Sequence, residues 1–166
     1  MSDIIDEGAG FDAAKFRQVL GHFPTGVTII TAIHEGQPIG FAVGSFASLS
    51  LDPPQVLFCA GKSSSTWPNI EAAGKFCVNV LADDQEDVSR VFASKASDKF
   101  AEIGWKRSGN GSPVINGVLA YIDCTLHQAV ESGDHFVVIG AVDDLDVSHE
   151  GGPLIFFRGG YGRFAV

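Results

Sequence analysis

Residues 45–67 read SFASLSLDPPQVLFCAGKSSSTW, and this stretch decides the fold class. Its first part, Ser45 to Leu51, alternates large apolar with small polar residues at period two, which is typical of a half-buried β-strand. Asp52-Pro53-Pro54 ends that strand, and a second strand is expected from Gln55 to Ala60. The small residues that follow predict a turn into a short helix at 66–73. The stretch therefore indicates a β-rich fold with tight connections.

The sequence on both sides continues this pattern. Phe16, Val19, Leu20 and Phe23 have helical spacing, which predicts a short amphipathic helix that packs one face on a core. We count about seven or eight strands and two or three short helices, which favours a mainly β fold built as a closed antiparallel barrel or a sandwich. The further elements expected are strands at 26–33, 39–43, 75–82, 118–130, 135–147 and 153–159, a helix at 83–93, and a polar surface loop at 94–113.

Size and charge limit the function classes. With 166 residues, 17.5 kDa and 45% hydrophobic residues, one domain over residues 1–166 is expected, with residues 1–10 flexible. Eleven basic against 20 acidic residues give a net charge of −9, which disfavours binding to nucleic acid or to an anionic membrane surface. No apolar run approaches the roughly 20 residues of a membrane helix, and the acidic start lacks the features of a secretory signal. We expect a cytoplasmic protein.

The three cysteines are expected to be buried reduced thiols. Cys59, Cys77 and Cys124 lie inside apolar runs, are odd in number and form no C-x-x-C pair. Burial is therefore favoured over a metal ligand or a disulfide.

Several catalytic motifs are missing. Gly61-Lys62-Ser63 resembles the end of a phosphate-binding P-loop, but the leading glycine of that motif would fall on Val56. There is no G-x-G-x-x-G after a strand and no G-x-S-x-G, and the five histidines never pair at metal-ligand spacing. We therefore expect no Rossmann site, no hydrolase nucleophile and no metal centre.

The turn between the second strand and the helix is the first candidate site. Free N–H groups at a helix start, several hydroxyls and one ammonium are the donors that a phosphate needs. An ordinary helix cap is an equally good interpretation, because Ser and Thr are favoured at caps for their own sake. The segment consists of Cys59, Ala60, Gly61, Lys62, Ser63, Ser64, Ser65 and Thr66.

Two further segments could contact a ligand. In Ser45-Phe46-Ala47-Ser48, small residues alternate with hydroxyls, which leaves room for a flat ring against the backbone, although a half-buried strand has the same pattern. Gly133-Asp134-His135 lies at a probable turn before an apolar strand. Its imidazole could donate to a bound amide or phosphate, or could simply be a turn histidine.

Seven segments, taken in order, resemble the short-chain flavin reductases, which have the split-barrel flavin-binding fold. The resemblance covers about residues 11 to 161, and within it we see most likeness to the reductase components of two-component hydroxylases that act on phenolic compounds. The segments are FPTGVTIITA, GFAVGSFASLSLDPPQVLFCAGKSSSTW, GKFCVNVLADDQ, FASKASDKF, GSPVINGVLAYIDC, GDHFVVIGAV and PLIFFRGGY.

The resemblance implies a homodimer with a flavin, FMN or FAD, near the subunit interface. It implies that Lys62 to Thr66 hold the flavin phosphate and that Phe92 and Lys99 approach the flavin ring. It also implies that His135 orients the nicotinamide of NADH, or of NADPH. The full set of expected flavin contacts is Gly40, Phe41, Ala42, Ser45, Phe46, Ala47, Ser48, Cys59, Ala60, Gly61, Lys62, Ser63, Ser64, Ser65, Thr66, Phe92 and Lys99; that for the nicotinamide nucleotide is Gly44, Ser45, His135 and Tyr161.

Hydride transfer between two stacked rings requires positioning rather than an acid or a base, which agrees with the lack of a catalytic triad. Reduced flavin reacts with oxygen, so a separate oxygenase that receives it is expected as a partner. Two alternatives stay open: a non-catalytic flavin- or haem-binding barrel, and a flavoprotein that keeps its flavin bound and reduces another acceptor. No basic cluster stands out for an extra phosphate, which favours NADH, although Arg158 and Arg163 leave NADPH open.

Overall fold

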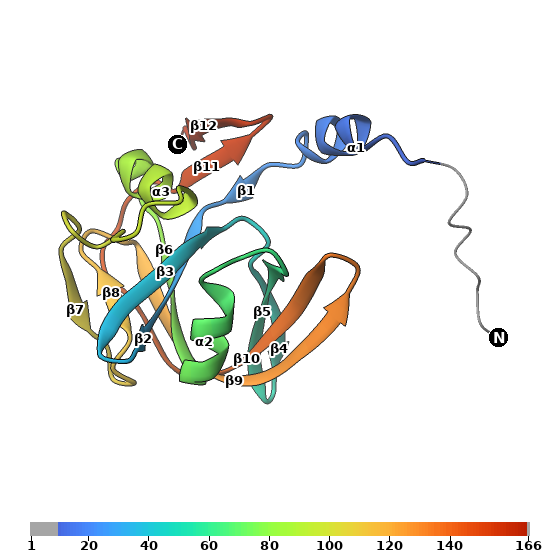
Figure 1. Cartoon of the computed structure of the whole chain (residues 1–166). Coiled ribbons are helices and arrows are strands. Elements are labelled where there is room, and N and C mark those ends of the chain that lie inside the picture. The colour runs from blue at the N-terminus through green and yellow to red at the C-terminus, as the bar shows by residue number, and fades with distance from the viewer. Residues whose placement is uncertain (1–9, 166) are drawn as a thin grey trace.

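The centre of the molecule is a seven-stranded antiparallel sheet (Figure 1). The computed structural model describes residues 10–165. The expectation that residues 1–10 are flexible therefore concerns, apart from Gly10, residues outside this range. The strands of this sheet are β2 (Thr28–His34), β3 (Gln37–Val43), β4 (Ala47–Leu51), β5 (Pro54–Gly61), β6 (Lys75–Val80), β9 (Ala120–Ser132) and β10 (His135–Val147). Their order across the sheet is β3-β2-β6-β9-β10-β5-β4.

Two small sheets and three helices surround the large sheet. One small sheet has the order β1-β11-β12 and the other pairs β7 with β8. Since β7 lies in the segment expected to be a polar loop, that expectation is wrong for these residues; a strand of three residues is too short to show a period. The bounds are β1 (Thr25–Gly26), β7 (Trp105–Arg107), β8 (Pro113–Ile115), β11 (Leu154–Phe157), β12 (Gly160–Arg163), α1 (Ala13–Leu20), α2 (Trp67–Ala73) and α3 (Glu86–Ala93).

The large sheet is split between β3 and β4. The mainly β, antiparallel class with three short helices is confirmed, but a closed barrel is wrong, because no sheet within residues 10–165 closes on itself. β3 and β4 follow one another in the chain, yet they form the two edges of the sheet. β4 pairs with β5, and Ser45 adds to this attachment: its Oγ accepts from the Cys59 N–H at 2.8 Å and lies 3.4 Å from the Cys59 carbonyl oxygen. These bonds hold the chain beside β5 instead of letting it return along β3.

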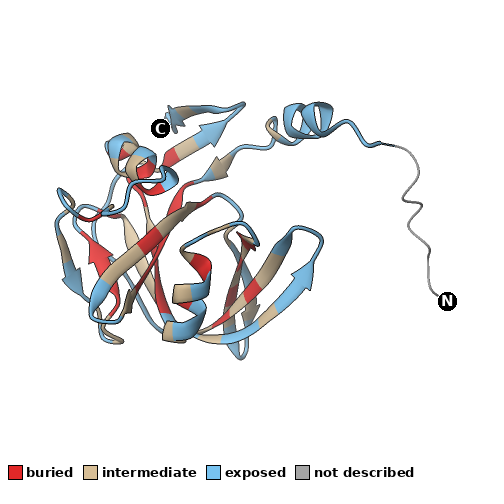
Figure 2. Ribbon diagram, in the orientation of Figure 1, coloured by how far each residue is buried: buried red, intermediate tan, exposed pale blue. Residues whose placement is uncertain are grey.

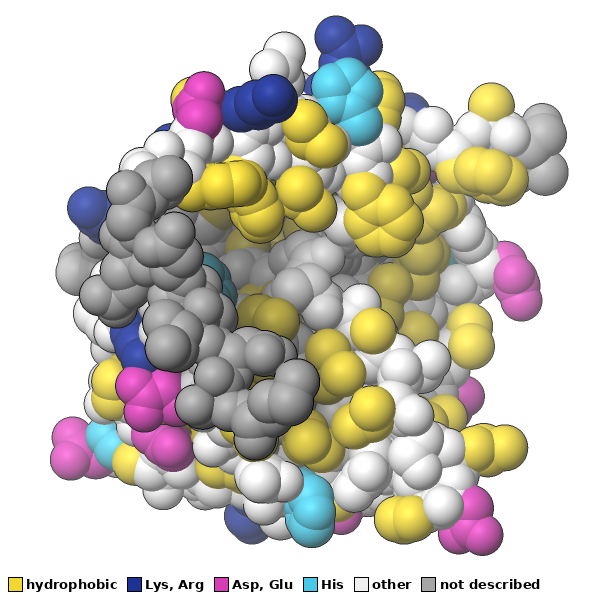
Figure 3. Space-filling view, turned by 90° about the vertical axis from the view of Figure 1, so that its right-hand side faces the viewer, with side chains coloured by type: hydrophobic (Ala, Val, Ile, Leu, Met, Phe, Trp, Pro, Cys, Tyr) yellow, Lys and Arg dark blue, Asp and Glu magenta, His cyan; other side chains and the backbone are white. Residues whose placement is uncertain are grey.

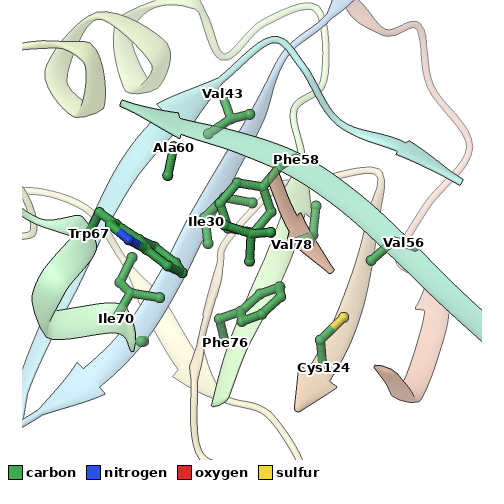
Figure 4. Packing of buried hydrophobic residues seen from close by; sticks show 12 residues of the cluster. Ile30, Val43, Val56, Phe58, Ala60, Trp67, Ile70, Phe76, Val78 and Cys124 are labelled. Atoms are coloured by element: carbon green, nitrogen blue, oxygen red, sulfur yellow. The ribbon is translucent and has the colours of Figure 1, made fainter. Parts of the chain in front are cut away.

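Aromatic rings fill the space that the large sheet encloses (Figure 4). The ring of Phe58 meets Phe76 and Trp67 edge to face, with centroids 5.4 and 6.1 Å apart. All three side chains are at most 2% exposed, and each such ring stabilises the fold by roughly 1.5–3 kcal/mol through burial. Trp67 belongs to α2, so the core holds this helix against β2, β3 and β6.

The helices form where the sequence predicts them, but one of them packs differently. α2 ends at Gly74, whose φ of 69° is the left-handed conformation that glycine adopts without strain. α1 forms with Asp12 as its cap, yet none of its residues is buried (Figure 2). The expectation that its apolar stripe packs on the core is therefore wrong. The helix is attached at its C-terminal end, where the Gly21 carbonyl accepts from the Arg158 N–H at 2.8 Å.

A buried polar cluster ties the β7–β8 hairpin to the large sheet. Asn79 on β6 is fully buried, and its Nδ2 donates to Thr31 Oγ1 at 3.0 Å and to the Pro113 carbonyl at 3.3 Å. Its Oδ1 accepts from the Ile115 N–H at 2.8 Å. Thr31 Oγ1 in turn donates to the Pro113 carbonyl at 2.6 Å. The Asn79 side chain thus provides hydrogen-bond partners for the backbone of β8 and holds the β7–β8 hairpin against the large sheet.

The cysteines are free thiols, and Cys77 and Cys124 are fully buried as expected. Burial raises the pKa of the Cys77 thiol, and Asp123 beside it raises that pKa further. Burial and the charges of nearby aspartates raise the pKa of Cys124 to about 12. Cys59 is only half-buried, so the expectation of full burial is wrong for this residue.

No helix in the part of the chain that the structure describes has the length and apolar character to cross a membrane.

We predict that Asn79→Ala destabilises the protein by about 2–4 kcal/mol, because it leaves the Ile115 N–H without its side-chain acceptor and removes one of the two donors to the Pro113 carbonyl inside the core. Chemical denaturation measures the change in the free energy of unfolding. Thr125→Ala, which removes an exposed hydroxyl bonded to Asp143, is the control and is expected to cost less than about 0.5 kcal/mol. Equal losses in the two variants would contradict a special role for Asn79.

Candidate functional site

A cleft of about 730 Å³ opens beside the free edge of β3. It is bounded by β3, by the turn that enters α2, and by the end of α3 with the loop that follows it. Its volume lies within the range of pockets for small ligands and cofactors. The lining residues are Pro38, Ile39, Gly40, Phe41, Ala42, Ser63, Ser64, Ser65, Thr66, Asn69, Phe92, Ala93, Ser94, Lys95, Ala96, Ser97, Lys99 and Phe100.

The first wall of the cleft is an edge strand. β3 pairs with β2 on one side only, so backbone groups on its other side have no strand partner. Gly40 brings this backbone close to its neighbours: an added Cβ would lie 2.9 Å from the Ile30 carbonyl oxygen and 3.0 Å from a ring carbon of Phe92. Only glycine fits there without displacing the strand or the ring.

The second wall is the hydroxyl-rich turn into α2. Ser64 caps the helix, because its Oγ accepts from the N–H groups of Thr66 at 3.2 Å and of Trp67 at 3.1 Å. Thr66, at the cap position itself, makes no such side-chain bond. Ser63 and Ser65 are exposed and line the cleft. The turn therefore contains a helix cap, and it also presents hydroxyls that the cap does not use.

The third wall is built from the end of α3 and residues 94–100. Phe92 is 1% exposed and meets Phe100 edge to face at 4.9 Å. Ser94 fixes the start of the loop by donating to the Val91 carbonyl at 2.6 Å. Asp98 fixes its end by accepting from the Phe100 N–H at 3.1 Å. The loop is therefore held at both ends.

Lys99 connects the third wall to the first. Its ammonium Nζ donates to the Phe92 carbonyl at 3.0 Å and to the Gly40 carbonyl at 3.4 Å. Burial lowers the pKa of Lys99, because the charged form is less well solvated there. Among the described residues no carboxylate pairs with this ammonium.

The charge of the cleft is opposite to that of the chain. Lys95 and Lys99 line it, and no aspartate or glutamate is among its lining residues, whereas the whole chain carries a net charge of −9. Such a cleft favours a ligand with negative charge or strong acceptors. Hydroxyls, free backbone groups and three phenylalanines add the contacts that a flat, anionic ligand needs.

Of the expected flavin contacts, Gly40, Phe41, Ala42, Ser63, Ser64, Ser65, Thr66, Phe92 and Lys99 come together in this cleft. Gly44, Ser45, Phe46, Ala47, Ser48, Cys59, Ala60, Gly61, Lys62, His135 and Tyr161 are not among the described residues that line it.

Lys62 and His135 lie together where the paired strands β5 and β10 end. Gly61 pairs with His135, and the Lys62 N–H donates to the Asp134 carbonyl at 2.9 Å. The Lys62 ammonium forms an ion pair with Glu131, which lowers the pKa of that carboxyl. His135 Nδ1 lies 2.8 Å from Asp134 Oδ1, which fixes the ring and leaves Nε2 toward Gly61.

Tyr161 on β12 packs against α3 and the buried hydrophobic cluster that contains Phe92. Its hydroxyl is 2.9 Å from Ser89 Oγ, and the Arg90 guanidinium lies 5.0 Å from the centre of its ring.

The sequence did not single out several lining residues. Pro38 and Ile39 precede the expected glycine segment on β3, and Asn69 lies in the first turn of α2. Ala93 to Ser97 form the rim. Their signals in the sequence are that Ser94 to Ser97 begin the aperiodic polar segment, since loops of this kind are often functional, and that all five lie in the segment FASKASDKF.

The chain matches the family model described as a flavin reductase like domain over residues 20–165. A flavin reductase from Pseudomonas putida is 54% identical, over 95% of this chain and 94% of that protein. The reductase subunit HsaB of a flavin-dependent monooxygenase from Mycobacterium tuberculosis is 55% identical, over 92% of this chain and 83% of that protein. A solved structure of the NADH:FAD oxidoreductase SgcE6 from Streptomyces globisporus, with NAD and FAD fragments, has a TM-score of 0.88 at 36% identity, over 93% of each chain.

We predict that Gly40→Ala lowers the free energy of unfolding by about 1–3 kcal/mol, because the added methyl group pushes against the Ile30 carbonyl and Phe92. Thermal and chemical unfolding measure the loss. Gly26→Ala is the matched control in a strand where nothing lies within 4 Å of the added Cβ. If Gly40→Ala is as stable as Gly26→Ala, the close approach at Gly40 is not a packing constraint.

Proposed function

The chain belongs to the family of flavin reductase-like domains, and we propose that it transfers a hydride from NADH to FMN or FAD and supplies the reduced flavin to a separate monooxygenase. The observation that carries this proposal is the cleft beside β3, where hydroxyls, free strand backbone and two lysines meet without a carboxylate. These groups fit a planar ring with polar edges and a phosphate tail. The relatives support the same activity, since they are named flavin reductase, reductase subunit and NADH:FAD oxidoreductase.

The residues of the cleft divide into two groups by their chemistry. Ser63, Ser65 and Thr66 offer hydroxyls at the turn into α2, so they would hold the flavin phosphate. The backbone of Gly40 to Ala42 would face the polar edge of the flavin ring, and Phe92 would contact its surface. When bound, the flavin supplies the two-electron acceptor, and the protein supplies position and charge.

His135 is proposed to orient the nicotinamide. Asp134 holds its Nδ1, so Nε2 is the atom left to contact a nucleotide. Gly44, Ser45 and Tyr161 are also proposed to contact the nicotinamide nucleotide, on the basis of the resemblance to the short-chain flavin reductases. Lys62 would join the phosphate contacts after giving up its ion pair with Glu131.

We propose that a second copy of this chain packs against the exposed apolar face of α1. Phe16, Val19 and Leu20 are each more than half exposed, and Phe11 and Phe23 beside them are 80% and 73% exposed. Figure 3 views the side on which α1 and the β9–β10 hairpin lie in Figure 1, and hydrophobic side chains gather there around a hollow. So much exposed apolar surface is typical of an interface, and we propose that it forms a homodimer.

The monooxygenase partner follows from the fate of the product. Reduced flavin in water reacts with oxygen, so a reductase that releases it needs an enzyme that captures it. Several relatives are named as reductase subunits or components of such systems. Because NADH is a cytoplasmic reductant, we propose the cytoplasm as the compartment.

We predict that the purified protein oxidises many equivalents of NADH per protein when FMN or FAD is added, because flavin enters and leaves the cleft as a substrate. NADH absorbance measures the rate, with NADPH, FMN, FAD and riboflavin compared in turn. A reaction that stops at one equivalent of flavin would contradict the substrate role. Flavin that survives extensive dialysis would instead support a permanently bound cofactor.

The same assay examines His135. Replacing His135 by Ala removes one hydrogen bond to the nucleotide, which corresponds to a rise of about fivefold in the nicotinamide KM. The flavin KM is expected to change less. An unchanged nicotinamide KM would remove His135 from the site.

We predict that the protein has twice the 17.5 kDa mass of one chain in solution, and that Leu20→Asp shifts it toward the monomer by placing a charge in the interface. Light scattering after size-exclusion chromatography gives the mass. Leu145→Asp changes another exposed leucine, outside α1, and serves as the control. A shift with Leu145→Asp but not with Leu20→Asp would contradict the role of α1.

A further inference from the structure

Lys99 differs from the other lysine of the cleft in how firmly it is held. Lys95 is exposed at the rim, and its ammonium has no hydrogen-bond partner among the described residues. Lys99 is half-buried, and two carbonyls on different elements fix its ammonium. A fixed charge needs little reorganisation when a ligand arrives, so it acts more strongly than a mobile one.

The two carbonyls do not use all the donors of Lys99. An ammonium has three N–H groups, and the structure gives two of them acceptors, Phe92 O and Gly40 O. No carboxylate in residues 10–165 neutralises its charge. The side chain lines the cleft, so a ligand there can supply the third acceptor and the missing negative charge. The lowered pKa of Lys99 agrees with a charge that lacks such a partner.

Hydride transfer changes the charge of the flavin ring. A hydride consists of one proton and two electrons, so a neutral oxidised ring that accepts it gains one negative charge. A fixed cation beside the ring therefore interacts more strongly with the reduced product than with the oxidised substrate.

We propose that Lys99 is the residue that makes the cleft favour reduced over oxidised flavin, through the one N–H that its protein partners leave free. This inference rests on the proposed function, and it adds the direction of the redox preference and the residue that sets it. Lys99 holds the newly formed anion in the cleft, and Lys95 at the rim contributes little to the preference.

The test is anaerobic binding without NADH, so it does not depend on turnover. Dissociation constants of riboflavin and of FMN, each in its oxidised and its dithionite-reduced form, are measured by equilibrium dialysis for the wild type, Lys99→Met, Lys99→Arg and Lys95→Met. Because a hydrogen bond to a charged group contributes about 1.5–3 kcal/mol, Lys99→Met is expected to weaken the reduced form roughly 10- to 100-fold more than the oxidised form. Lys95→Met is expected to change the ratio less than about threefold, and Lys99→Arg to keep part of the preference.

Three results would overturn the inference. Equal losses for the two redox states in Lys99→Met would mean that Lys99 only supports the loop. A loss for FMN without a loss for riboflavin would mean that Lys99 binds the phosphate. An equal change of the ratio in Lys95→Met would mean that general charge, and not the fixed ammonium, sets the preference.

Lys99→Gln, which is neutral but can still donate, replaces Lys99→Met if circular dichroism shows that the latter is unfolded; because Gln removes the charge but keeps a donor, a smaller loss of the preference for reduced riboflavin is expected. A wild type that prefers reduced riboflavin but oxidises no NADH would refute the proposed function and leave this inference standing.

Discussion

The unpaired edge of β3 is the constraint on which the rest of the structure depends. A strand edge presents N–H and C=O groups that must find water, a side chain or another strand. Here β4 pairs with β5, and Ser45 bonds the Cys59 N–H on the same strand, so β4 does not pair with β3. α2 and the loop after α3 approach that edge instead, and Lys99 bonds the Gly40 carbonyl. The cleft exists because the sheet is left open at this place.

Much of the fold could be predicted because its signals are local. Alternation and proline breaks located β4 and β5, and Gly74 marked the end of α2. The packing partner of a helix or strand is harder to predict than the element itself, since periodicity shows which face is apolar and not which element covers that face. That is why α1 was placed as a helix but wrongly packed on the core. The prediction of a closed barrel was wrong for a similar reason: β4 pairs with β5 and not with β3, and periodicity does not report strand partners.

The site was partly predictable, because some of its residues have a local signal in the sequence and others come together only through packing. Ser63 to Thr66 carry a chemistry that can be recognised in sequence, and the family resemblance added Gly40, Phe92 and Lys99. These residues are far apart in the chain, and the packing of both α2 and α3 against β3 brings them together. Lys95 to Ser97 could not be named, because an aperiodic loop gives no direction to its side chains. Ser48 and Tyr161 carry suitable groups, yet they lie on other elements.

The loop from Ser94 to Asp98 has its two ends fixed and its middle exposed. On that side the cleft meets solvent, while on the β3 side Gly40 and Phe92 leave no spare room. The proposed ring contacts thus lie on the close-packed side of the cleft, and Ser63 and Ser65, the proposed phosphate contacts, are exposed. A cleft of this shape would select for the flavin ring and tolerate different groups attached beyond the phosphate. One reductase could then serve oxygenases that require different flavins.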